Sequence, residues 1–221
     1  DDVDVVLCPS HVHLDFTARL LDEQKVIRLG AQNVSQHRQG AYTGEVSCEM
    51  LVEAGCRYVL VGHSERRRLF GETSFIVAEK FAAVRAAGLI PILCLGESGA
   101  ARQARRAFEV IAEELDIVIE KNGAMAFDNA IIAYEPIWAV GTGKCATPEQ
   151  AQEVHSFIRG RLAEDTPVIG EKVRIIYGGS VTPTNARDLF AQPDIDGGLI
   201  GGASLDSDAF LGIVEAAKGA S

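Results

Sequence analysis

One carboxylate stands at a position where it could act as a general base. Glu135 ends an apolar run that begins at Ala130, and Pro136 follows it directly. The residue before a proline is biased toward extended backbone, so the sequence predicts Glu135 at the last position of a strand. Two glycines, Gly141 and Gly143, follow within a short loop. A carboxylate on a rigid strand end beside a loop that can close is typical of an enzyme base with a lid.

A histidine offers the second group for catalysis. His63 follows the apolar run Tyr58 to Gly62 and directly precedes a helical pattern. The start of a helix carries a partial positive charge, which disfavours a further positive charge on the imidazole ring. We therefore expect His63 to stay neutral and to be able to donate a hydrogen bond to a carbonyl oxygen. The alternative is a histidine with a purely structural role.

Two glycine pairs follow the last two expected strands. Gly178 and Gly179 precede Ser180, and Gly201 and Gly202 stand at the end of the last apolar run. Glycine lets a ligand approach the backbone closely, and loops after the last strands of a β/α barrel form its usual phosphate site. Tight turns explain most glycine pairs that occur alone, but two glycine pairs at the ends of adjacent strands favour a phosphate site. Such a site, a base and a neutral histidine suit proton transfer next to a carbonyl group in a small phosphorylated substrate.

The elements that must position these residues alternate along the chain. Nearly continuous apolar runs predict buried parallel strands at residues 5–8, 26–33, 58–62, 90–95, 130–135, 173–177 and 197–201. Amphipathic patterns predict helices at residues 15–22, 47–54, 65–68, 75–87, 102–121, 148–163, 184–191 and 207–218. The alternation predicts an α/β fold in a single domain over residues 1–221. An open doubly wound sheet and a (β/α) barrel both fit, and a closed barrel needs eight strands.

Composition and charge argue against several classes of protein. The net charge of −10 argues against a nucleic-acid or anionic-membrane surface. No apolar stretch approaches the ~18 residues of a membrane helix, and the acidic start is unlike a signal peptide. Five cysteines, an odd number without a CxxC pair, predict reduced thiols in a cytoplasmic protein. Gly141-Thr142-Gly143 lacks the rest of a dinucleotide fingerprint, and no cofactor or metal is expected.

Several motifs together resemble the triosephosphate isomerase family, with its bacterial members the most similar. The motifs are Gly30 to Asn33, Gly40 to Glu45, Gly62 to Arg67, Ala133 to Gly143, Tyr177 to Val181 and Gly201 to Leu205. They run over essentially the whole chain, and several are long. The resemblance implies a (β/α)8 TIM barrel that works without a cofactor. It implies interconversion of dihydroxyacetone phosphate and D-glyceraldehyde 3-phosphate through an enediolate, in glycolysis and gluconeogenesis.

The resemblance also implies roles for individual residues. Glu135 is similar to the base that moves a proton between two carbons of the triose, and His63 to the neutral group that polarises the carbonyl. Ser64, similar to the residue that holds the glutamate at rest, and Glu65 are expected to support them. The expected phosphate-binding residues are Gly141, Ser180, Gly201 and Gly202. The expected lid residues are Pro136, Ile137, Trp138, Ala139, Val140, Gly141, Thr142 and Gly143. Tyr42 and Thr43 lie on a loop similar to one that docks into a partner subunit, which implies a homodimer.

One part of the family pattern is missing from these residues. The family carries an Asn-x-Lys segment at the end of its first strand, whose lysine helps to bind substrate. This chain opens where the family's second strand begins, so one strand–helix unit of roughly 35 residues is absent. We expect the natural protein to include that unit, because a barrel without it would expose two sheet edges.

Two other functions stay open at this point. A chain that truly lacks the lysine would be a catalytically impaired barrel that binds a phosphorylated ligand. Another phosphosugar isomerase or an aldolase is a more distant alternative, although the expected strands offer no lysine suited to a Schiff base.

Overall fold

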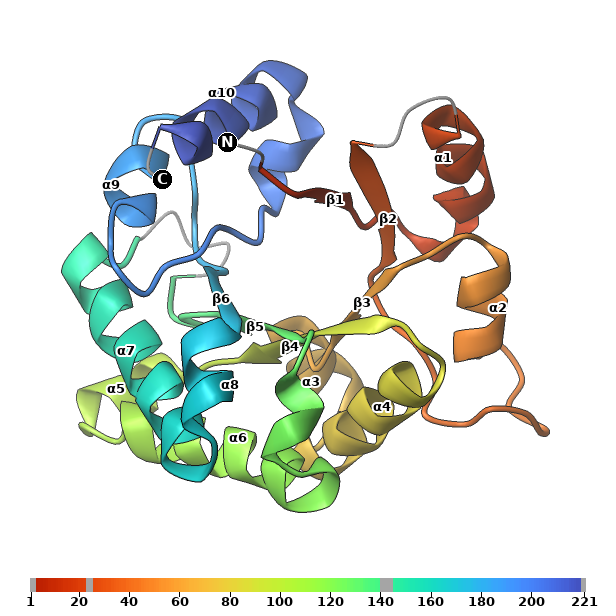
Figure 1. The fold of residues 1–221 in the computed structure, drawn as a ribbon, viewed down its shortest axis with the longest axis horizontal. Coiled ribbons are helices and arrows are strands. Elements are labelled where there is room, and N and C mark those ends of the chain that lie inside the picture. The colour runs from red at the N-terminus through yellow and green to blue at the C-terminus, as the bar shows by residue number, and fades with distance from the viewer. Residues whose placement is uncertain (1–2, 23–25, 140–144, 220–221) are drawn as a thin grey trace. The chain divides into compact units, whose positions relative to one another are not determined.

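A computed structural model describes residues 3–22, 26–139 and 145–219. The chain forms two compact units. Their helices and strands are labelled in Figure 1. The N-terminal unit comprises Asp4–Leu93 and Ile117–Ala130, and the C-terminal unit comprises Cys94–Asp116 and Ile131–Ser221 together with Asp1–Val3. The single domain over residues 1–221 stays a prediction.

The N-terminal unit is built on parallel strands that follow one another in chain order. They are β1 (Val5–Leu7), β2 (Ile27–Ala31), β3 (Tyr58–Val61) and the first part of β4 (Ile90–Leu95). Tyr58 pairs with Gly30 on one side and with Ile90 on the other. The helices of this unit are η1 (His11–His13), α1 (Leu14–Leu21), α2 (Cys48–Glu53), α3 (Ser64–Phe70), α4 (Ser74–Ala86) and η2 (Ala124–Phe127).

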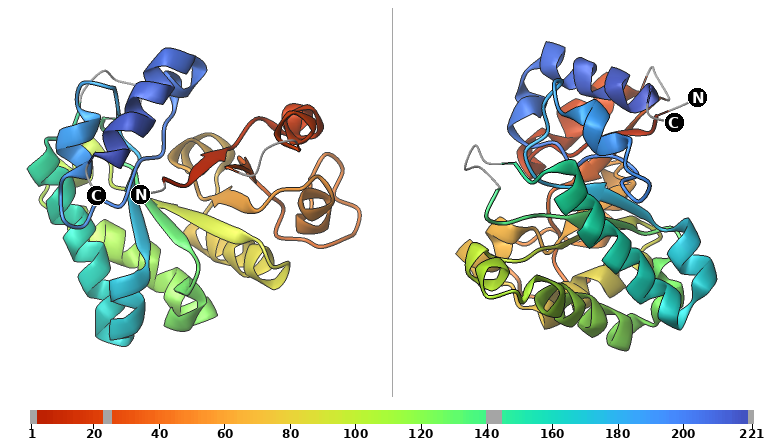
Figure 2. Two further views of the ribbon diagram at one scale, coloured as in Figure 1. Left: turned by 45° about the horizontal axis from the view of Figure 1, so that its top comes forward. Right: turned by 90° about the vertical axis from the view of Figure 1, so that its left-hand side faces the viewer.

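The C-terminal unit continues with the end of β4, β5 (Ile131–Tyr134) and β6 (Arg174–Tyr177). β5 and β6 are parallel and pair from Ile131↔Arg174 to Tyr134↔Tyr177. The helices are α5 (Gly99–Gln103), α7 (Pro148–Asp165), α8 (Pro167–Lys172), α9 (Ala186–Phe190), η3 (Gly202–Leu205) and α10 (Ser207–Lys218), while α6 (Ala107–Asn122) runs into the N-terminal unit. Figure 2 shows α7 and α8 lying side by side.

Side-chain caps explain where several helices begin. Ser47, Thr73, Ser98 and Asp206 each accept a hydrogen bond from the backbone N–H three residues later. Thr147 does the same for α7, and its own backbone N–H donates to the side-chain oxygen of Gln150 to complete a capping box. These bonds satisfy N–H groups that have no partner within the helix. The first turns are therefore fixed by local sequence.

Two expected elements differ from the structure, and the helix α8 was not expected. The helix expected over residues 102–121 is two helices, α5 and α6, because Arg105 adopts a left-handed φ of 57° between them. Pro167 starts the additional helix α8 after Thr166, which is extended. The last expected strand, residues 197–201, is reduced to an isolated parallel bridge between Tyr177 and Gly198. Its pairing is limited to a few backbone bonds, among them Tyr177 N–H to Gly197 O and Leu199 N–H to Tyr177 O, each 2.9 Å.

The other expected strands and helices are confirmed to within a few residues. Within the described ranges, every helix is too short or too polar to cross a bilayer.

A buried histidine lies in the core of the C-terminal unit. His155, on α7, is 0% exposed, and its ring lies 5.8 Å from the Tyr134 ring and 6.4 Å from the Tyr177 ring between centroids. Its Nδ1 lies 3.0 Å from the carbonyl oxygen of Asp194, so Nδ1 carries the proton. Nε2 has no hydrogen-bond partner among the described residues. Burial lowers the pKa of His155 from 6.5 to about 4, because a charged ring would lose its hydration.

This histidine makes the stability of the protein depend on pH. The folded chain keeps His155 neutral down to about pH 4, whereas the unfolded chain protonates it near pH 6.5. Stability contributed by the neutral ring is therefore lost as the pH falls from 6.5 to 4, by up to about 3 kcal/mol. His155→Asn keeps a donor toward Asp194 but cannot titrate in this range. Urea unfolding from pH 7 to 4 should show the stability difference between wild type and variant shrinking by that amount. A difference that stays constant with pH would contradict this assignment.

Candidate active site

Glu135, the expected base, lies directly after β5 and is 1% exposed. Its backbone N–H donates to Leu95 O at 2.7 Å, which continues the pairing of β5 with β4 beyond the last strand residue. On the other side, Gly178 N–H donates to Tyr134 O, also at 2.7 Å. The backbone around Glu135 is thus fixed from both neighbouring segments. The prediction that Glu135 stands at a strand end is confirmed.

Two glycines leave the space that Glu135 occupies. A Cβ atom at Gly96 would lie 1.8 Å from Glu135 O, and a Cβ atom at Gly178 would lie 2.9 Å from Glu135 Cγ. No side chain fits at either position without displacing the glutamate. Gly178 therefore leaves room for the Glu135 side chain, whereas the sequence connected the Gly178-Gly179 pair only with phosphate.

The segment after Glu135 begins with a tight turn. Ala139 N–H donates to Pro136 O at 2.7 Å, and Ile137 N–H donates to Glu97 O at 3.2 Å. Pro136 and Ala139 are buried. Of the expected lid residues, Val140, Gly141, Thr142 and Gly143 lie outside the described residues, and so does the expected phosphate contact of Gly141.

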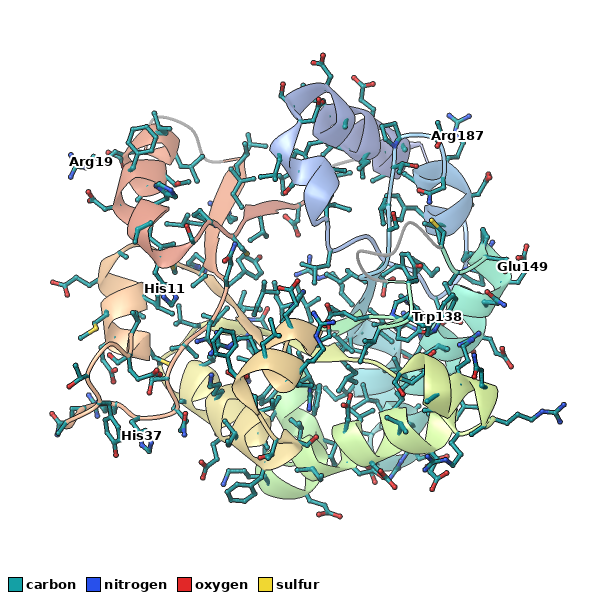
Figure 3. All side chains as sticks on the ribbon, turned by 180° about the vertical axis from the view of Figure 1, so that it is seen from behind. His11, Arg19, His37, Trp138, Glu149 and Arg187 are labelled. Carbon is teal, nitrogen blue, oxygen red and sulfur yellow. The ribbon has the colours of Figure 1, made fainter. Side chains whose placement is uncertain are left out.

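A second buried carboxylate, Glu97, escaped the sequence analysis. It is 0% exposed, and its Oε1 accepts hydrogen bonds from Trp138 Nε1 at 2.8 Å, Arg102 Nη1 at 3.0 Å and Tyr134 Oη at 3.2 Å. Trp138, labelled in Figure 3, belongs to the segment of the chain that joins β5 to α7. The position of Glu97 could have been noticed in the sequence, because Glu97 lies shortly after β4 and Glu135 lies directly after β5. The hydrogen-bond partners of Glu97 could not be predicted, because Tyr134 and Trp138 are about forty positions away in the sequence.

The two tyrosines beside the core histidine keep their protons. Burial raises the pKa of Tyr177 to about 12, and burial together with the nearby Glu97 carboxylate raises the pKa of Tyr134 still further. Tyr134 therefore acts as a donor to Glu97. Tyr177 Oη accepts from Ala146 N–H at 3.4 Å, so it contacts the chain just before α7 begins.

His63 lies in the N-terminal unit as the N-cap of α3, as expected from the sequence. The backbone N–H of Glu65 donates to His63 Nδ1 at 3.3 Å, whereas the Glu65 carboxylate is 3.8 Å from the same atom. Because Nδ1 is an acceptor, a neutral ring carries its proton on Nε2. Ser64 is buried at the first position of the helix, and the Glu65 side chain is exposed.

The expected phosphate-binding residues that can be described lie in the C-terminal unit. Asn185 Nδ2 donates to Ser180 O at 3.1 Å, and Thr182 N–H donates to Asn185 Oδ1 at 2.8 Å, so one amide side chain fixes the loop that carries Ser180. Gly201 and Gly202 are exposed at the start of η3, and a Cβ atom at either would meet nothing within 4 Å. The protein's own packing at these two positions does not require glycine.

The expected subunit loop lies in the N-terminal unit. Tyr42 and Thr43 are both exposed, and the Tyr42 ring stacks on His37 with 3.8 Å between centroids. A turn closed by Glu45 N–H to Tyr42 O, 3.0 Å, holds the tip of the loop. In the part of the chain that is described, His, Cys, Asp and Glu side chains form no cluster of three suited to a metal ion.

Gly96→Ala tests the close approach at Glu135. The new Cβ must push the Glu135 carbonyl away from β4, so we expect the free energy of unfolding to fall by about 3 kcal/mol. Gly160→Ala makes the same chemical change inside α7, where a Cβ would meet nothing within 4 Å outside the helix, and should raise stability by up to about 1 kcal/mol. Urea denaturation of both variants measures the contrast. Equal effects would show that the space beside Glu135 is not restricted.

Comparisons with known proteins agree with this arrangement. A family described as triosephosphate isomerase matches residues 1–217. Curated triosephosphate isomerases from Shewanella denitrificans and Shewanella amazonensis are each 69% identical to this chain, and one from Shewanella halifaxensis is 68% identical. Each alignment covers 100% of this chain and 87% of the relative. This chain therefore belongs to the triosephosphate isomerase family and has its α/β TIM-barrel fold.

Proposed function

We infer that this chain interconverts dihydroxyacetone phosphate and D-glyceraldehyde 3-phosphate by proton transfer through an enediolate, a step of glycolysis and gluconeogenesis. Its 69% identity to a relative named triosephosphate isomerase, over its full length, supports this reaction. That similarity disfavours both an impaired phosphate-binding barrel and a distant phosphosugar enzyme. The observation that carries the chemistry is the buried carboxylate of Glu135 at the end of β5.

Glu135 is the proposed base. Backbone hydrogen bonds on both sides hold its main chain, and Gly178 leaves room for its side chain. A base held in this way needs little reorganisation before it removes a proton from the carbon next to the carbonyl group. The same carboxyl group then returns the proton to the neighbouring carbon, so no cofactor is needed.

His63 is the proposed group that polarises the substrate carbonyl. Its Nδ1 accepts a backbone N–H in the first turn of α3, so its proton is on Nε2. A neutral N–H donor stabilises the developing enediolate oxygen. Glu65 supports its position through that backbone hydrogen bond, and Ser64 keeps the role that the family resemblance implies for it, holding the glutamate at rest.

The phosphate group is proposed to bind the backbone N–H groups of Ser180, Gly201 and Gly202, together with Gly141. The open space in front of Gly201 and Gly202 supports this assignment, because a close ligand is a reason for glycine that internal packing does not supply. The lid is proposed to comprise Pro136 to Gly143. Loop closure that excludes water is well known for this family.

Glu135→Gln tests the role of the base. The amide has nearly the same shape but cannot accept the proton, so turnover should fall by at least about a thousandfold. The affinity for sn-glycerol 3-phosphate, a non-reacting analogue with a hydroxyl in place of the carbonyl, should change less than about threefold. Coupled kinetic assays and isothermal calorimetry give the two values. Glu153→Gln, the same change at an exposed position on α7, should leave both unaltered. Retained turnover in Glu135→Gln would exclude Glu135 as the base.

We further propose that two copies of the chain form a homodimer through the loop that carries Tyr42 and Thr43. Both residues are exposed, although a buried aromatic is the commoner arrangement. The five free cysteines support the cytoplasm as the setting of the protein, because thiols stay reduced there.

Thr43→Glu tests the dimer. A charge placed in a subunit contact has no partner to compensate its lost hydration, so the variant should be monomeric where wild type has about twice the mass of one chain. Light scattering after size-exclusion chromatography measures the mass. Ser156→Glu adds the same charge at an exposed position on α7 and should stay dimeric. A wild-type monomer, or a dimeric Thr43→Glu variant, would contradict the proposed interface.

A further inference from the structure

Arg102, on α5, contacts the buried carboxylate and the indole ring that follow two neighbouring strands. Its Nη1 donates to Glu97 Oε1 at 3.0 Å, and its guanidinium carbon lies 5.1 Å from the centroid of the Trp138 ring. Glu97 in turn accepts the indole N–H of Trp138 at 2.8 Å. The three side chains therefore contact one another in a closed triangle.

Charge explains the contact between Arg102 and Glu97. Glu97 is 0% exposed, and its second oxygen, Oε2, has no hydrogen-bond partner among the described residues. The other two donors to Oε1 are the uncharged hydroxyl of Tyr134 and the indole of Trp138. Arg102 forms an ion pair with this carboxylate, and a buried charge that loses its counter-ion is strongly destabilised. Without the guanidinium, the buried carboxylate that accepts the indole N–H would lose this counter-ion.

Shape explains the contact between Arg102 and the Trp138 ring. A planar guanidinium can face an aromatic ring and donate to a carboxylate at the same time, whereas a lysine ammonium is a point charge. The Trp138 Cβ atom is also confined, since a Cβ atom at Gly99 would lie 3.3 Å from it. Arg102 thus acts on Trp138 in two ways, through the shared carboxylate and by direct contact with the ring.

The position of Trp138 is coupled to Glu135 through a short and constrained segment. Only Pro136 and Ile137 separate the two residues, the proline fixes one backbone dihedral angle, and Ala139 N–H closes a turn on Pro136 O. Ile137 N–H also donates to Glu97 O. A shift of the indole ring must therefore be taken up close to the strand end that carries the base.

We propose that Arg102 is a positioning residue that holds Trp138, and through Trp138 the backbone that follows Glu135, in the arrangement needed for proton transfer. Its effect on turnover rests on the proposed isomerase function, but its effect on Trp138 does not. Arg102 binds Glu97 and the Trp138 ring, so its removal should lower kcat more than it changes KM.

The single tryptophan of the chain makes this proposal directly measurable. Arg102→Met keeps the length of the stem and removes charge and planarity, whereas Arg102→Lys keeps the charge alone. In Arg102→Met we expect a red shift of tryptophan emission by several nanometres and about twofold stronger quenching by acrylamide. We expect kcat to fall about tenfold, with KM for dihydroxyacetone phosphate within about twofold of wild type. Arg102→Lys should recover most of the thermal stability but only part of the emission and of kcat.

Arg106→Met is the matched control, because Arg106 is exposed in the short link between α5 and α6. It should leave emission, quenching, kcat and KM as in wild type. Unchanged emission in both folded Arg102 variants would overturn the proposal, and so would a loss of kcat without any change at Trp138. If Arg102→Met does not fold, Arg102→Lys decides by the same two readings. If the Arg102 variants show the emission shift but the wild-type chain shows no turnover, the positioning of Trp138 would be supported and the isomerase proposal contradicted.

Discussion

The close pairing of Glu135 with the end of β4 is the constraint on which the C-terminal part of the site depends. A 2.7 Å hydrogen bond from Glu135 N–H to Leu95 O brings the two chains together where both strands end. At that point a Cβ on Gly96 would overlap the Glu135 carbonyl, and a Cβ on Gly178 would press on its side chain. The proposed base is thus held by backbone pairing on both sides. Parallel strands suit this purpose, since their carboxyl ends meet at one edge of the sheet.

Two buried carboxylates follow neighbouring strands and serve different ends. Glu97 accepts three hydrogen bonds on one oxygen, one of them from a cation, which makes it an anchor for side chains around it. The main chain at Glu135 is held by hydrogen bonds on both sides, and two glycines leave space beside the residue. We therefore assign Glu97 to the packing of the side chains around it and keep Glu135 as the proposed base.

Much of this arrangement could be predicted from local sequence. Pro136 indicated the extended position of Glu135, and the Thr147 cap placed the start of α7. The residues around His63 predicted its place at the start of α3. Features that depend on distant partners could not be predicted. The contacts of Glu97 with Tyr134 and Trp138 join residues about forty positions apart. The break between α5 and α6 occurs at Arg105, where neither a glycine nor a proline indicates a helix end in the sequence.

The central claim is that a base moves a proton between two adjacent carbons of the substrate. The most direct test is to convert dihydroxyacetone phosphate with the wild-type chain in deuterium oxide and to trap the product. A carboxyl group that carries the proton exchanges it with solvent during its lifetime, so glyceraldehyde 3-phosphate should contain deuterium on C2 by nuclear magnetic resonance. Product formed at the enzymatic rate with no deuterium on C2 would indicate direct hydride transfer between the carbons. That result would contradict the role assigned to Glu135.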